Sequence, residues 1–152
     1  MIQNTQFRAA SLIVQLGNAV TYYRNLKMEH IGLTSVQSDA LIAALRNPGI
    51  TAARLKEQLQ LSQSTVAGIL SRLESKGLIE KKADQEDARK AILTPTDQGL
   101  ALEMPLKEIA LETQQSLVEG MSEAEQEEFI RLLDIALENM NRVRQAQPSG
   151  GR

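Results

Sequence analysis

The chain has 152 residues, 42% hydrophobic and only 3% aromatic, enough for one domain or two small modules that share a largely aliphatic core. The absence of cysteine excludes disulfides, thiolate metal sites and thiol-based redox sensing. The N-terminus is polar and no apolar run approaches the roughly 20 residues of a membrane span, which predicts a soluble, cytoplasmic protein without a targeting segment or membrane partner.

Charge is divided unevenly along the chain, although the net charge is only −2. Residues 1–94 carry 12 Lys and Arg against 8 Asp and Glu, whereas residues 95–152 carry 5 against 11. The basic first part permits an anionic partner, while the acidic part favours solubility. Solvated helix faces produce similar excesses, so the asymmetry alone does not indicate nucleic-acid binding.

Apolar spacing predicts helices along most of the chain. We expect them at residues 7–29, 34–46, 51–59, 62–76, 96–119 and 122–144. Thr34 and Ser62 are good N-cap residues, and Gly77 suits the position after a helix C-terminus. Ser122 and Glu125 form the Ser-x-x-Glu pattern of a capping box. The sequence therefore predicts a mostly helical protein with well-marked helix starts.

Residues 51–94 combine two closely spaced helices with a short hairpin. The third and fourth helices are separated only by residues 60–62, a spacing typical of a helix-turn-helix. Residues 78–82 and 90–94 flank a polar stretch and predict a small β-hairpin. Lys81, Lys82, Arg89 and Lys90 surround the hairpin loop, where they could lie along phosphates or enter a minor groove. A solvated turn is the alternative explanation for these charges.

The fourth helix has an unusual exposed face. Four apolar residues at i, i+3, i+4 and i+7 must face the core; they are Val66, Ile69, Leu70 and Leu73. The opposite face is small and hydroxylic, with one cation at its flank; it comprises Ser64, Thr65, Ala67, Gly68, Ser71, Arg72 and Ser75. Small side chains let a helix sit deep in a major groove. They also suit close packing against another protein element, which remains the alternative.

Four segments in order resemble the MarR family, over roughly residues 10–145. They are Leu33-Thr34-x-x-Gln37-x-x-x-Leu41, then Ser64-Thr65-Val66 with Arg72-Leu73-Glu74 and Gly77-Leu78-Ile79, then Asp84-x-x-Asp87-x-Arg89, then Thr96-x-x-Gly99. The resemblance implies an all-α fold with a small β-hairpin wing, in which long helices form a dimerisation region beside a winged helix-turn-helix. The implied domains are residues 33–95 for DNA binding and residues 1–32 and 96–145 for dimerisation, with a disordered tail at 146–152.

The resemblance also implies a function. The chain is expected to be a sequence-specific regulator of transcription that binds double-stranded DNA, a ligand-responsive repressor that meets a pseudo-palindromic operator as a homodimer. Arg89 would aim at the minor groove, with Asp87 orienting it. Together with the helix geometry, this gives a set of expected DNA-contacting residues: Gln63, Ser64, Thr65, Gly68, Arg72, Lys81, Asp87 and Arg89.

The outer helices carry the remaining candidates. The last helix has an apolar stripe too long to bury against a small reading module; it comprises Phe129, Leu132, Leu133, Ala136, Leu137, Met140 and Val143. The stripe predicts packing between subunits, and an isolated hairpin of long helices is the alternative. Family members often bind small aromatic or phenolic anions between the two regions. Candidate contacts for such an effector are Tyr22, Tyr23, Arg24 and His30. The other interpretation makes Tyr23 a core residue and His30 a surface or interface group.

Catalysis has little support in the sequence. His30 is the only histidine and cysteine is absent, which excludes a Cys/His site and a histidine-rich metal site. Neither a glycine-rich phosphate loop nor a Gly-x-Ser-x-Gly elbow occurs. We therefore expect no enzyme activity, no cofactor and no metal. A helical interaction module without DNA contact is the main alternative, and a small enzyme is the weaker one.

Overall fold

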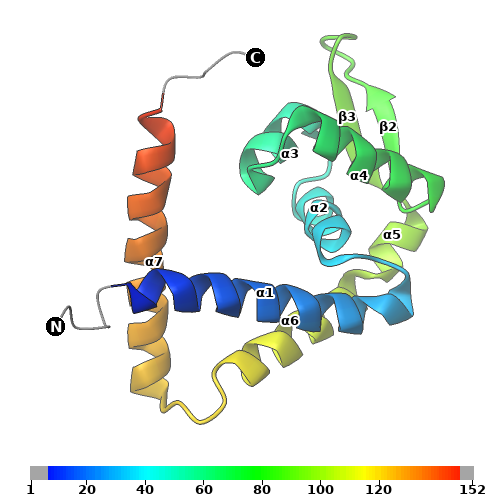
Figure 1. Ribbon diagram of the computed structural model, residues 1–152. Helices are drawn as coiled ribbons and strands as arrows, with labels where there is room; N and C mark the ends of the chain where they lie inside the picture. Colours follow the sequence, from blue (N-terminus) through cyan, green and yellow to red (C-terminus); the bar gives the residue numbers. More distant parts are fainter. Residues whose placement is uncertain (1–6, 148–152) are drawn as a thin grey trace, which may run out of the picture. The chain divides into compact units, whose positions relative to one another are not determined.

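The computed structural model describes residues 7–147 (Figure 1). Contacts divide the chain into two units, a first up to residue 113 and a second from residue 114, and each is described by itself. Most of the expected disordered tail, residues 148–152, lies outside the described residues. The division into a DNA-binding and a dimerisation region stays a prediction, because it concerns how two copies pack.

The first unit consists of helices and short strands. They are α1 (Arg8–Met28), the 3₁₀ turn η1 (Glu29–Ile31), α2 (Ser35–Arg46), β1 (Ile50–Thr51), α3 (Ala52–Leu59), α4 (Gln63–Ser75), β2 (Ile79–Ala83), β3 (Ala91–Pro95), α5 (Asp97–Ala101) and most of α6 (Glu103–Leu117). The second unit holds the end of α6 and α7 (Glu123–Gln145). The expected all-α fold with a small β wing is confirmed.

The predicted caps set the helix starts. The Thr34 hydroxyl accepts the Gln37 amide at 3.2 Å, and the Gln37 side chain reaches back to the Thr34 amide, so α2 opens with a full capping box. Ser122 and Glu125 form the expected box at the start of α7. Because these bonds join residues three apart, they can be read from the sequence alone.

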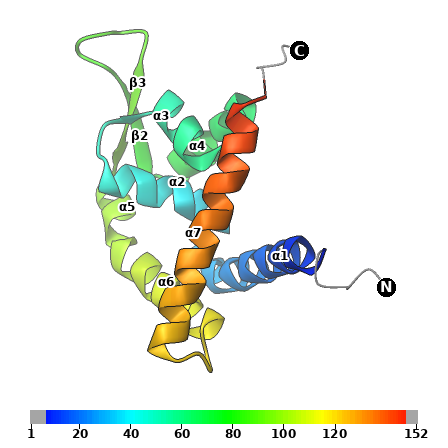
Figure 2. The ribbon, with the colours of Figure 1, turned by 90° about the vertical axis from the view of Figure 1, so that its left-hand side faces the viewer.

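The core of the first unit surrounds α2, which packs against α1, α4 and β3. Leu41, Leu55, Leu73 and Leu93 are completely buried there. Figures 1 and 2 show the β2–β3 hairpin projecting beyond α3 and α4. The core thus fixes α4 on the outside of the unit with the hairpin beside it.

The predicted hairpin is part of a three-stranded antiparallel sheet in the order β1-β3-β2. Ile79 pairs with Pro95 and Ala83 with Ala91 across the hairpin. The third strand, β1, was not predicted; its Ile50 pairs with Leu93 and ties the α2–α3 connection to the hairpin. Two residues are too few to give a strand pattern in the sequence.

The single helix predicted at residues 96–119 is wrong, because the chain forms α5 and α6 with a break at Leu102. The cause is Pro105, in the first turn of α6. Proline has no amide hydrogen to donate to the carbonyl of Ala101 four residues earlier, and its ring crowds that carbonyl. At the break, the Leu102 amide donates to the Gly99 carbonyl, three residues earlier, at 3.1 Å. The next helix, α6, begins at Glu103.

Large apolar side chains remain exposed on the outer helices. In the first unit they include Leu12, Ile13, Val14 and Leu26 of α1. In the second unit α7 exposes Ile130, Leu132, Ile135, Leu137, Met140 and Val143. Leu16, Val20 and Tyr23 of α1 are half-buried. None of the helices in residues 7–147 is long and apolar enough to cross a membrane.

Candidate nucleic-acid interface

The N-terminus of α4 is organised by a cluster of hydroxyl groups. Ser62 caps the helix by accepting the Thr65 amide at 3.2 Å. Its hydroxyl also lies 2.7 Å from the Thr65 hydroxyl and 3.2 Å from that of Ser64. These bonds hold the side chains of Ser64 and Thr65 at the helix start, where N–H groups favour a phosphate or another anion.

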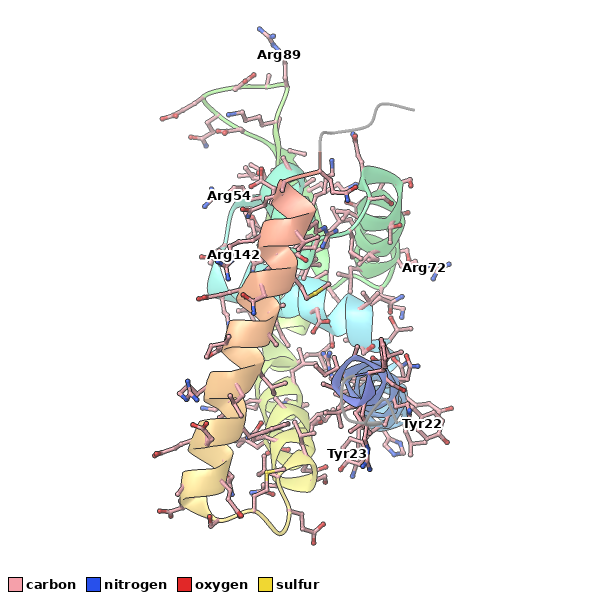
Figure 3. The ribbon with its side chains drawn as sticks, turned by 60° about the vertical axis from the view of Figure 1, so that its left-hand side comes forward. Tyr22, Tyr23, Arg54, Arg72, Arg89 and Arg142 are labelled. Carbon is pink, nitrogen blue, oxygen red and sulfur yellow. The ribbon has the colours of Figure 1, made fainter. Side chains whose placement is uncertain are left out.

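The face of α4 predicted to read DNA is open to solvent. Gln63, Ser64, Thr65, Gly68 and Arg72 are all exposed, whereas the apolar stripe at Val66, Ile69, Leu70 and Leu73 is buried as expected. A methyl group added at Gly68 would meet no described atom within 4 Å beyond the backbone of its own helix. Figure 3 shows Arg72 extending from α4 away from the core. No described element of the first unit covers this face, which removes the packing explanation within that unit.

The hairpin presents its cations at its tip and along β2. The Arg89 side chain is 96% exposed and stands at the end of the loop in Figure 3. Lys81 is exposed on β2, and the neighbouring Lys82 lies 3.3 Å from Glu80 on the same strand. The Lys82–Glu80 pair is exposed, so it contributes little to stability.

Asp87 acts mainly on the backbone of the loop. Its carboxylate accepts the Arg89 amide at 3.1 Å, while the Arg89 guanidinium is 3.9 Å away, beyond hydrogen-bond distance. Asp84 forms the same type of turn by accepting the Glu86 amide at 3.0 Å. The two aspartates therefore shape the loop that carries Arg89, and the side chain of Arg89 stays extended toward solvent.

Two of the four expected effector contacts are engaged by the protein itself. The Arg24 guanidinium lies 2.5 Å from a carboxylate oxygen of Asp39 and donates to the Ser38 hydroxyl at 3.2 Å, which ties α1 to α2. Tyr23 stacks under the Lys27 ammonium, 5.5 Å from the ring centre. Lys27 in turn lies 3.0 Å from Glu112 of α6. Its hydrogen bond to Glu112 raises the pKa of Lys27 above the ordinary value.

The other two expected contacts are separated by the fold. Tyr22 is 72% exposed and borders a cleft of about 450 Å³ at the end of α1, in which His30, also exposed, takes no part. Figure 3 shows Tyr22 and Tyr23 leaving α1 in different directions. The cleft adds polar residues that the sequence analysis missed: Asn25, Thr34, Gln37 and Lys76. In the sequence, Lys76 is more than 40 residues away from the cleft residues of α1, and only the fold brings it beside them.

We expect the Arg24–Asp39 contact to contribute to stability. Arg24→Ala removes the charged hydrogen bonds and leaves a half-buried carboxylate, so the free energy of unfolding should fall by about 1–3 kcal/mol. Urea unfolding followed by circular dichroism measures the change. Arg8→Ala, on the exposed start of the same helix, is the matched control and should leave the midpoint unchanged. Equal midpoints for the two variants would contradict the assigned role.

Comparison with known proteins places this geometry in a family. Residues 31–90, which include α2, α3, α4 and most of the hairpin, match the model of the MarR family. The chain is 25% identical over 130 residues to YybA of Bacillus subtilis, named as an uncharacterized helix-turn-helix transcriptional regulator, and the match covers 86% of this chain and 87% of that protein.

Solved structures agree over most of the chain. A MarR transcriptional regulator from Methanosarcina mazei superposes with a TM-score of 0.82 at 26% identity, covering 89% of this chain and 97% of that one. BpsR of Bordetella bronchiseptica, whose DNA binding is described as regulated by 6-hydroxynicotinic acid, superposes with a TM-score of 0.77 at 24% identity, covering 84% and 91%. The motifs, the family match and the shared fold agree: residues 31–90 match the MarR family, and the chain as a whole has the fold of winged-helix transcriptional regulators.

Proposed function

We propose that this regulator is a homodimeric, ligand-responsive repressor that binds double-stranded DNA at a pseudo-palindromic operator and acts in the cytoplasm. The observation that carries the proposal is the exposed face of α4, which is small, hydroxylic and open to solvent, beside an exposed basic hairpin. The match of residues 31–90 to the MarR family and the relative named as a transcriptional regulator support a regulator rather than an enzyme. DNA binding regulated by a small aromatic acid in BpsR supports the ligand-responsive part of the proposal.

The two DNA-contacting elements have different roles in this proposal. Gln63, Ser64, Thr65 and Gly68 enter the major groove with α4, where short side chains can reach base edges. Arg72 of α4 and Lys81 of β2 lie at the border of the groove contact and meet phosphates. Arg89 enters the minor groove from the loop that Asp87 shapes. Contacts to the backbone position the protein, while contacts to base edges select the sequence.

Dimerisation follows from the apolar side chains that a single chain leaves exposed. Exposed large apolar side chains are grouped along α1 and along α7, and grouped apolar exposure marks an interaction surface. A second copy would cover them and set two α4 helices about 34–36 Å apart, one turn of DNA. Residues 1–32 and 96–145 would then form the dimerisation region, with residues 33–95 as the reading module.

Binding to operator and scrambled duplexes, measured by fluorescence anisotropy at several salt concentrations, tests the proposal. The operator is first selected from random duplexes with the purified protein. We expect a steep loss of affinity as salt rises, because Lys and Arg displace counterions from DNA. Sedimentation should give two chains per operator. A protein that selects no sequence and sediments as a monomer would instead fit the interaction-module alternative.

Arg89→Ala should weaken binding to the operator and to scrambled DNA alike. A contact to the backbone and minor groove is largely independent of sequence, so the slope of log affinity against log salt should flatten by about one unit per half-site. Lys107→Ala, which removes an equal charge from the exposed face of α6, is the control and should keep the wild-type slope. An unchanged slope in Arg89→Ala would mean that the hairpin does not touch DNA.

A further inference from the structure

Helix α4 and the β2–β3 hairpin meet at residues 76–78, which we call the α4–β2 junction. The Gly77 amide donates to the Glu74 carbonyl at 2.9 Å, and the Leu78 amide donates to the Leu73 carbonyl at 3.0 Å. With Gly77 at a φ of +70°, these bonds form a Schellman motif, which reverses the chain after a helix. The junction therefore sets the angle at which the hairpin leaves α4.

Lys76 attaches this junction to a distant part of the first unit. Its ammonium donates to the backbone carbonyl of Gly32 and, at 3.1 Å, to the side-chain oxygen of Gln37. Gln37 is buried, and the same oxygen accepts the Thr34 amide at 3.3 Å in the capping box of α2. A lysine near the end of a helix commonly bonds the carbonyls of its own last turn. Lys76 instead reaches 44 and 39 residues back along the chain, to the turn between α1 and α2.

Thr96 gives the junction a second attachment, at the start of α5. Its hydroxyl donates to the Gly77 carbonyl at 2.5 Å, and its amide donates to the Leu78 carbonyl at 3.1 Å. Thr96 also caps α5 by accepting the Gly99 amide at 3.1 Å, so this attachment is part of a helix start. The junction is thus bonded to two separate parts of the first unit, the α1–α2 turn and α5.

We propose that Lys76 is a positioning residue for DNA binding, which holds the α4–β2 junction so that α4 and Arg89 of the hairpin reach DNA together. The inference rests on the proposed function, in which α4 enters the major groove and Arg89 the minor groove. Both contacts form at once only if the angle between helix and hairpin matches the spacing of the grooves. A junction that is fixed before binding avoids the cost of ordering it on DNA. Lys76 acts through its bonds to Gly32 and Gln37 and does not itself touch DNA.

Amide hydrogen exchange on the full chain, without DNA, tests the attachment. Lys76→Met keeps the apolar stem and removes both bonds, so the amides of Gly77 and Leu78 should exchange about five- to tenfold faster. The amide of Leu70, in the middle of α4, should keep its rate. Lys76→Arg keeps the charge and the donors and should exchange as the wild type does. Unchanged exchange of Gly77 and Leu78 in Lys76→Met would show that Lys76 does not hold the junction.

Fluorescence anisotropy on the selected operator tests the positioning role. Lys76→Met should bind the operator about five- to tenfold more weakly than the wild type, and Lys76→Arg should restore most of the affinity. Lys107→Met removes an equal charge from α6, outside the junction, and should bind as the wild type does. If Lys76→Arg binds as weakly as Lys76→Met, the bonds to Gly32 and Gln37 do not position the DNA-contacting elements, and the proposal is wrong.

A double-mutant cycle with Arg89→Ala separates positioning from folding. Arg89→Ala should cost about tenfold in operator affinity in the wild type but less than about threefold in Lys76→Met, because a loose hairpin no longer places Arg89 on DNA. A smaller folded fraction would lower both affinities by the same factor and leave the cost of Arg89→Ala unchanged, so equal costs would overturn the proposal. A wild type that binds no DNA would refute the proposed function and this role with it, and the exchange rates would still decide whether Lys76 holds the junction.

Discussion

Gly99→Ala is expected to lower the free energy of unfolding of the first unit by about 3 kcal/mol, because the new methyl group has no room. An ideal Cβ on Gly99 would lie 2.1 Å from the carbonyl oxygen of Leu78 and 3.2 Å from its carbonyl carbon. These are backbone atoms, which cannot rotate aside. The same oxygen accepts the Thr96 amide at 3.1 Å, so moving it also breaks the bond that docks α5 on the start of β2.

Urea unfolding followed by circular dichroism measures this loss, with Gly17→Ala as the matched control. Gly17 lies within α1, and beyond the backbone of that helix no described atom comes within 4 Å of the methyl group that alanine would add. Its replacement should therefore raise the free energy of unfolding by about 0.5–1 kcal/mol through helix propensity. A Gly99→Ala protein that unfolds at the wild-type urea concentration would show that α5 can move away from β2 without cost.

Local signals made most of the helix boundaries predictable. Thr34, Ser62 and Ser122 each cap a helix through an amide three residues later, and such bonds depend only on neighbouring sequence. The break between α5 and α6 was missed although its cause, Pro105, is also local. The apolar spacing continued across it and favoured one helix. Here a proline in the first turn of α6 mattered more than periodicity.

Contacts between distant residues could not be predicted in the same way. Strand β1 exists because Ile50 meets Leu93, and Lys76 completes the cleft because α4 ends beside Gly32. Arg24 was expected to face a ligand, and its pairing with Asp39, on the next helix, has no pattern in the sequence that distinguishes it from a solvated charge. Such contacts follow from packing, which a single sequence does not specify residue by residue.

The exposed face of α4 was the best-predicted part of the candidate site. A 3.6-residue period that places Val66, Ile69, Leu70 and Leu73 in the core leaves the opposite side to solvent, and the structure has this arrangement. The periodicity does not say what covers that side in a complex. The assignment of Gln63, Ser64 and Thr65 to base contacts is therefore still a prediction.

Gly68 gives the sharpest way to test that assignment. Glycine inside a helix costs about 0.5–1 kcal/mol relative to alanine. Gly68 lies in the middle of α4, and beyond the backbone of that helix no described atom approaches its missing side chain within 4 Å. Its φ is not among the positive values found at Gly32, Gly49, Gly77 and Gly120. The fold of the first unit thus does not require glycine at this position. A DNA groove pressed against α4 would require a residue without a side chain there.

Gly68→Leu should consequently separate folding from DNA binding. Leucine is a better helix former than glycine, so the free energy of unfolding should rise by about 0.8 kcal/mol. Its side chain would hold α4 away from the base edges, and operator affinity should fall by about 2 kcal/mol, roughly thirtyfold, while affinity for scrambled DNA changes little. Gly68→Ala should show the same trends at smaller size. Anisotropy on both duplexes and urea unfolding measure the two effects on one protein sample. A Gly68→Leu protein that binds the operator as tightly as the wild type would exclude this face of α4 from the groove, because a leucine side chain there could not avoid the DNA.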